Sequence, residues 1–93
     1  IYIDDFINAF NLLLIRGKHL KIYNIGTSEK LTIINLIEII SKLLGKKVKV
    51  LKSPLQKGST KIRVPNISNI KKIGFKQKIK IKKGLEETIK FYL

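Results

Sequence analysis

Among the side chains that could bind a ligand, Arg63 stands out. The chain has 18 Lys residues but only two Arg residues, and Arg63 lies in a segment bounded by Gly58 and Pro65. A guanidinium is a planar fork that donates two parallel hydrogen bonds to one phosphate group, which a Lys ammonium cannot do. A lone Arg in such a loop therefore indicates either a phosphate-binding group or a solvated surface residue.

No other set of side chains forms a pattern typical of catalysis or metal binding. The six acidic residues and His19 occur singly or in neighbouring pairs, so no cluster has the spacing of metal ligands. Glu86 and Glu87 are adjacent and do not share a helix face, which excludes them as an acid/base pair. We predict no catalytic residue and no metal site in this chain.

The formal net charge is +14, which raises the possibility of nucleic-acid binding through Lys71 to Lys83. Base readers favour Arg over Lys, however, and Ile and Lys contribute 18 residues each, as an AT-rich coding sequence would produce. We therefore interpret the basic surface mainly as drift or solubility, with a small nucleic-acid-binding module as an alternative. The chain has no Cys and no apolar run long enough to span a membrane, so we expect a cytoplasmic protein.

The apolar periodicity predicts four helices and two short strands. The first helix is capped by Asp4 or Asp5 and ends before Gly17, and the second is capped by Thr32 and ends at Gly45. Lys80, Lys82 and Lys83 give the last helix charges of the wrong sign for its dipole, so its start is expected to fray. The remaining predicted elements are strands over 20–25 and 48–51, a loop over 54–66, and helices over 68–73 and 81–92.

Several of these segments together resemble a known enzyme family. Gly58, Arg63, Pro65-Asn66, Gly74-Phe75 and a final helix from Gly84 to Tyr92 follow one another with the spacing of the C-terminal, substrate-binding part of the extended short-chain dehydrogenase/reductase family. Upstream, residues 2–6 (YIDDF) resemble the strand-to-helix turn of that family, and residues 22–26 (IYNIG) resemble its "YNIG" strand. The family comprises NAD-dependent sugar-nucleotide epimerases and dehydratases, and the UDP-glucose 4-epimerase branch is the most similar.

The resemblance implies an α/β fold in which residues 1–26 end the Rossmann part and residues 27–93 form a small substrate-binding lobe. Arg63 matches the family's pyrophosphate-binding Arg, and Gly58 lets its loop bend towards the ligand. Asp5 is expected to cap and orient the first helix. Asn24 and Gly26 lie at the end of the predicted strand, where such folds present ligands, although a turn that needs glycine explains Gly26 equally well.

The chemistry of the family also needs a Gly-rich turn against NAD and a Tyr followed four residues later by Lys. Neither pattern occurs here, because Tyr2 and Tyr23 are followed at that distance by Phe6 and Thr27. We therefore expect the back third of a longer isomerase or lyase, or half of a split enzyme whose Rossmann-domain partner binds NAD. The expected function is binding of a nucleotide-diphosphate sugar without activity in isolation. A non-functional remnant of the enzyme is an alternative.

Overall fold

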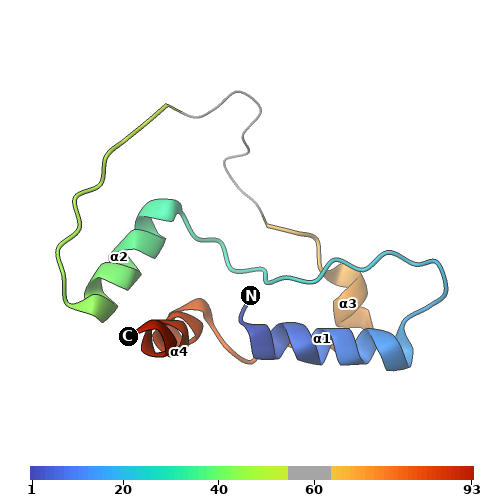
Figure 1. The fold of residues 1–93 in the computed structure, drawn as a ribbon. Helices are drawn as coiled ribbons and strands as arrows, with labels where there is room; N and C mark the ends of the chain where they lie inside the picture. The colour runs from blue at the N-terminus through green and yellow to red at the C-terminus, as the bar shows by residue number, and fades with distance from the viewer. Residues whose placement is uncertain (55–63) are drawn as a thin grey trace. The chain divides into compact units, whose positions relative to one another are not determined.

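The computed structural model describes residues 1–54 and 64–93, and its regular secondary structure there is helical. Within these residues four helices follow one another: α1 (Ile3–Arg16), α2 (Ile33–Leu44), α3 (Ser68–Lys72) and α4 (Ile81–Tyr92) (Figure 1). None of these helices is long and apolar enough to cross a membrane. The chain forms two compact units, one made of residues 1–29 with 64–93 and the other of residues 30–63.

The core of the first unit joins segments that are far apart in the sequence. Ala9 of α1 is buried together with three residues of the downstream segment, Ile67, Ile70 and Phe75. α3 lies beside the C-terminal half of α1 (Figure 1), where the Arg16 Nη1 group donates a 3.1 Å hydrogen bond to the carbonyl oxygen of Ile73. The partly buried residues that pack against this core are Leu12, Leu13, Tyr23, Ile25 and Ile73.

The α/β prediction is wrong for the described residues, because they contain no strand. A strand exists only where its backbone N–H and C=O groups meet a neighbouring strand. The segment 20–25 meets side chains instead, for example the Asn69 Nδ2 group, which donates 3.1 Å to the carbonyl oxygen of Ile22. At its start, Leu20 has a φ of 57°, in the left-handed region, which interrupts an extended run. The segment 48–51 likewise belongs to no strand.

The helix predictions hold, because their signals are local. Thr32 Oγ1 accepts a 3.1 Å hydrogen bond from Asn35 N at the start of α2, and Gly45 ends this helix with a φ of 64°, as the sequence predicts. The cap of α1 differs from the prediction. Tyr2 precedes the helix without a side-chain cap, and the two Asp residues lie in the first turn, where they still complement the helix dipole.

The apolar stripe of α1, formed by Phe6, Phe10, Leu13 and Leu14, is largely uncovered. The exposed fraction is 41% for Phe6, 49% for Phe10 and 71% for Leu14, and only Leu13 of the stripe packs against the core.

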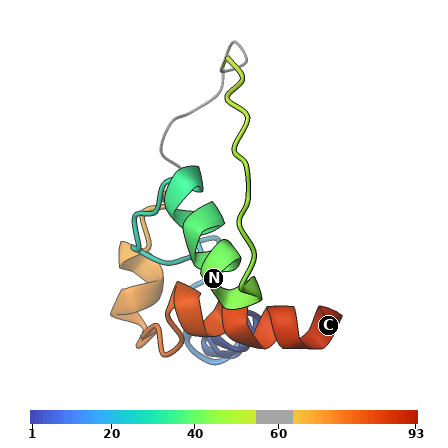
Figure 2. The same cartoon turned by 90° about the vertical axis from the view of Figure 1, so that its left-hand side faces the viewer.

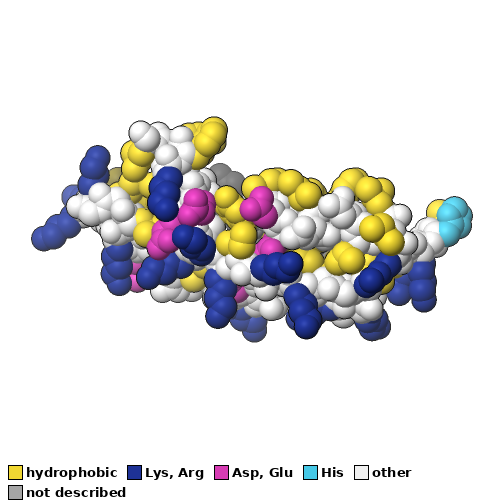
Figure 3. All heavy atoms as spheres, turned by 90° about the horizontal axis from the view of Figure 1, so that it is seen from below, with side chains coloured by type: hydrophobic (Ala, Val, Ile, Leu, Met, Phe, Trp, Pro, Cys, Tyr) yellow, Lys and Arg dark blue, Asp and Glu magenta, His cyan; other side chains and the backbone are white. Residues whose placement is uncertain are grey.

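Apolar side chains and Lys or Arg side chains both reach the face of the molecule shown in Figure 3. The last turn of α4 extends away from α1 and α3 (Figure 2), and Phe91 and Tyr92 there are exposed.

Candidate functional site

Asp5 connects the start of α1 to the segment that leads into α4. Its side chain is 1% exposed. The carboxylate accepts hydrogen bonds of 3.2 Å from the backbone N–H of Lys78 and 2.9 Å from that of Ile79. Hydrogen bonds to an ionised acceptor are about twice as strong as neutral ones. Asp5 therefore orients a segment more than 70 residues away, in addition to its place in the first turn of α1.

Glu29 holds the next part of the same segment. Its Oε1 atom accepts a 3.2 Å hydrogen bond from the backbone N–H of Ile81, the first residue of α4, and a second bond from Gln77 Nε2. The other bond from Gln77 Nε2 goes to the carbonyl oxygen of Ile79, at 3.0 Å. Sequence reasoning did not single out Glu29. The sequence signal that could have identified Glu29 is the scarcity of acidic residues in a chain of net charge +14. Two of the six acidic residues, Asp5 and Glu29, bond to this segment.

These bonds change the prediction that α4 begins with unfavourable charges. Lys80, the residue before α4, offers no side-chain cap, and the first turn holds no acidic residue. The Glu29 carboxylate supplies negative charge at the N-terminus of α4 from outside the helix, where a helix dipole favours it. A tertiary contact thus replaces a local cap at the start of α4.

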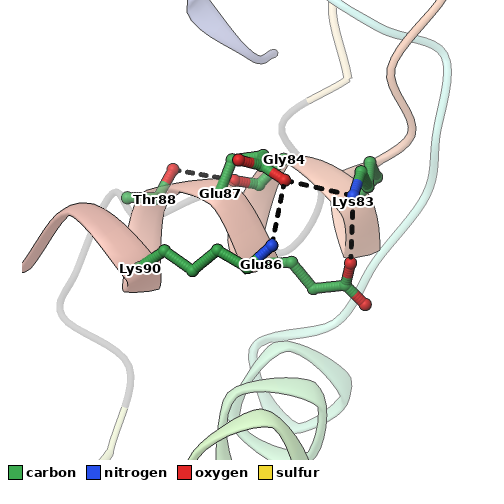
Figure 4. Close-up of polar contacts among 6 residues, drawn as sticks. All are labelled: Lys83, Gly84, Glu86, Glu87, Thr88 and Lys90. Carbon is green, nitrogen blue, oxygen red and sulfur yellow. Dashed lines mark hydrogen bonds and ion pairs between the residues drawn. The ribbon is translucent and has the colours of Figure 1, made fainter. Parts of the chain in front are cut away.

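Within α4, charged side chains form a short network one turn apart (Figure 4). Lys83 Nζ lies 3.1 Å from Glu87 Oε1 and 3.6 Å from Glu86 Oε2, and Lys90 Nζ lies 3.4 Å from Glu87 Oε1. The hydrogen bond from Lys83 lowers the pKa of Glu87, and the same bond raises the pKa of Lys83. The first-turn Lys83 is therefore compensated inside the helix, but these exposed pairs contribute little to stability.

A cavity of about 240 Å³ lies beside the segment that Asp5 and Glu29 hold. Its polar lining comes from Thr27, Glu29, Gln77 and Thr88. The remaining lining residues are Ile1, Tyr2, Ile79, Ile81, Gly84 and Leu85. All of them belong to the first unit, so the cavity is formed within one compact part of the chain.

Asn24 and Gly26 contact the segment that follows the predicted ligand loop. Asn24 Nδ2 donates a 3.2 Å hydrogen bond to the carbonyl oxygen of Asn66. A Cβ atom added to Gly26 would lie 2.6 Å from Cγ of Pro65, so a side chain at this position would clash. Gly26 does not have a positive φ, and close approach is the reason for glycine here. The upstream motif and the Pro65-Asn66 motif thus lie together.

The two predicted substrate-binding residues, Gly58 and Arg63, lie outside the described residues. Of the predicted residues, Asp5, Asn24 and Gly26 are described. Asp5 reaches the segment before α4, whereas Asn24 and Gly26 reach residues 65–66. In residues 1–54 and 64–93, no group of three His, Cys, Asp or Glu side chains is placed to hold a metal ion.

Comparison with known proteins gives matches along the whole chain. The probable GDP-L-fucose synthase 1 of Oryza sativa subsp. japonica is 28% identical over 93 residues, which are 100% of this chain and 28% of that protein. The GDP-L-fucose synthase 1 of Arabidopsis thaliana is 27% identical over 93 residues, 100% of this chain and 29% of that protein. An uncharacterized protein of Methanocaldococcus jannaschii is 29% identical over 93 residues, 99% of this chain and 28% of that protein.

GDP-L-fucose synthases are members of the extended short-chain dehydrogenase/reductase family. The chain is thus similar to part of such enzymes. It spans about 28% of the length of the curated relatives that it matches. No protein-family model matches the chain. No solved structure matches it either.

Proposed function

We propose that this chain is the segment of a sugar-nucleotide enzyme that holds the diphosphate of a nucleotide-diphosphate sugar. The observation that carries the proposal is the similarity to GDP-L-fucose synthases over all 93 residues of the chain. These enzymes are named for a nucleotide-diphosphate sugar. The motif spacing around Arg63 supports it independently, because a lone Arg fork among 18 Lys suits a diphosphate.

In this proposal, Arg63 grips the diphosphate and Gly58 allows the loop to approach it. Residues 27–93 act as the substrate-binding lobe, and the nicotinamide cofactor and the catalytic Tyr and Lys belong to a Rossmann domain outside these residues. The contacts of Asn24 and Gly26 with residues 65–66 support a defined position for the chain just after Arg63. No residue of this chain takes part in hydride or proton transfer.

The base of the nucleotide is the finer part of the proposal. The names of the plant relatives favour a guanine nucleotide, whereas the resemblance to the UDP-glucose 4-epimerase branch favours a uracil nucleotide. Parallel titrations with GDP and UDP distinguish the two, and the tighter ligand identifies the branch.

The test of Arg63 is the dissociation constant for GDP and UDP, with the chain joined to or mixed with a Rossmann-domain partner. Arg63→Ala removes a charge-assisted fork worth about 1.5 to 3 kcal/mol, which is roughly tenfold to a hundred-and-fifty-fold in affinity. Arg63→Lys should recover only part of the loss, because an ammonium keeps the charge but loses the bidentate geometry.

Lys61→Ala is the matched control, because it removes one positive charge two residues away. Its effect on the dissociation constant should be much smaller than that of Arg63→Ala. Equal losses at both positions would mean that the loop acts only as diffuse positive charge, and the assignment of Arg63 would be wrong.

A further inference from the structure

Two polar groups in the cavity beside the N-terminus of α4, those of Gln77 and Thr88, retain only acceptor capacity. Both hydrogens of Gln77 Nε2 are donated, one to Glu29 and one to the carbonyl oxygen of Ile79. The Gln77 side chain can therefore form a further hydrogen bond only as an acceptor, through its amide oxygen. The Thr88 hydroxyl donates 2.8 Å to the carbonyl oxygen of Gly84 and retains only acceptor capacity.

Glu29 adds charge to this set. An ionised carboxylate has no donor, and both bonds made by Glu29 in the described residues go to its Oε1 atom. Its Oε2 atom accepts no hydrogen bond from any residue that the structure describes. Among the residues that the structure describes, Glu29 is the only one with a charged side chain in the lining of this cavity. Gln77, Thr88 and Glu29 therefore offer acceptors and one negative charge, whereas the hydroxyl groups of Thr27 and Tyr2 in the same lining can donate as well as accept.

The rest of the wall is apolar and the volume is small. Ile79, Ile81 and Leu85 line the cavity together with the ring of Tyr2. A volume of about 240 Å³ is larger than the cavity of about 150 Å³ that holds benzene in another protein, and smaller than a typical drug-sized pocket. A ligand that suits these walls has a compact apolar body of about one ring and one hydrogen-bond-donating group.

We infer that this cavity binds a small primary ammonium compound, with its cation on Glu29 and its apolar body against Ile79, Ile81 and Leu85. This proposal is independent of the diphosphate proposal, because its ligand has the opposite charge. The chain's net charge of +14 opposes the approach of a cation, but exposed charges are screened beyond about 8 Å at physiological ionic strength.

The probe is benzylammonium at neutral pH and physiological salt, with chemical-shift changes or calorimetry as the measurement. Benzyl alcohol and benzoate are neutral and anionic compounds of the same size. Benzylammonium should bind at least about tenfold more tightly than benzyl alcohol, and benzoate should not bind, because a charge-assisted bond is about twice as strong as a neutral one.

Two variants assign the binding to this cavity. Glu29→Gln should weaken benzylammonium binding about tenfold, whereas Glu38→Gln, which removes an acid from α2, should leave it unchanged. Leu85→Phe should abolish binding by filling the cavity without removing a polar group, and Leu51→Phe is its exposed control. Circular dichroism of each variant checks that the helices persist.

The inference is overturned if benzylammonium shows no saturable binding up to about 10 mM, since that corresponds to less than a millimolar-range affinity. Equal affinities for benzylammonium and benzyl alcohol would also overturn it. The same holds if Leu85→Phe retains the helices and binds the cation as tightly as Leu51→Phe. None of these outcomes bears on Arg63, so the two proposals fail separately.

Discussion

Removing the Asp5 carboxylate should destabilise the first unit much more than removing its neighbour Asp4. Both residues lie in the first turn of α1 and carry the same charge, but Asp5 is buried and Asp4 is exposed. Asp5→Ala deletes the acceptor for the backbone N–H groups of Lys78 and Ile79. Asp4→Ala removes an equal charge from the helix N-terminus without that loss.

The size of the effect follows from these bonds. An unsatisfied buried donor costs about 1 to 3 kcal/mol, which gives roughly 2 to 6 kcal/mol for two. The bonds are only partly buried, so the lower half of that range, about 2 to 4 kcal/mol, applies. Asp4→Ala should cost about 0.3 to 1 kcal/mol, the value of one charge at a helix end.

Asp5→Asn separates charge from shape. The amide keeps one acceptor oxygen but places an NH₂ group near the backbone donors, so its cost should fall between those of Asp4→Ala and Asp5→Ala. This ordering tests whether the carboxylate acts through its two acceptor oxygens or only fills space.

Urea unfolding followed by far-ultraviolet circular dichroism measures the free energy of unfolding for the wild type and the three variants. Because small domains are stable by only about 5 to 15 kcal/mol, the loss in Asp5→Ala should shift the midpoint strongly or prevent folding. The reasoning is refuted if Asp5→Ala and Asp4→Ala agree within about 0.5 kcal/mol, the usual scatter of neutral surface changes.

Three further predictions concern the chain alone. The hydrogen bond from Lys83 lowers the pKa of Glu87, so the stabilisation from this pair is complete above the ordinary Glu pKa of about 4.3 and is lost as the pH falls through the lower pKa of the folded chain. The helical signal should therefore fall slightly in acid, because exposed pairs contribute little, and Glu87→Gln should flatten that part of the pH profile. The chain should not bind NAD, because it lacks the Gly-rich turn, and micromolar binding in a calorimetric titration would contradict this. Since Phe6, Phe10 and Leu14 are exposed, the chain should associate through these residues, and a monomer in sedimentation would count against it.

The sequence by itself determined the helices, because their signals lie within a few residues of one another. α2 begins after Thr32 and ends at Gly45, and a cap and a left-handed glycine need no distant partner. The spaced motifs of the sequence also indicated a resemblance to sugar-nucleotide enzymes. This resemblance agrees with the names of the plant relatives.

Only the tertiary structure decided which elements pair and which acids matter. The segment 20–25 has the composition of a strand, but strand formation depends on a partner strand elsewhere. Here the bonds to the downstream segment involve side chains instead, from Asn69 to the carbonyl oxygen of Ile22 and from Asn24 to the carbonyl oxygen of Asn66. Asp5 and Glu29 bond to residues 48 to 74 positions away, and no local rule predicts such a distance. The start of α4 follows the same principle, since its capping charge comes from Glu29 and not from its own first turn.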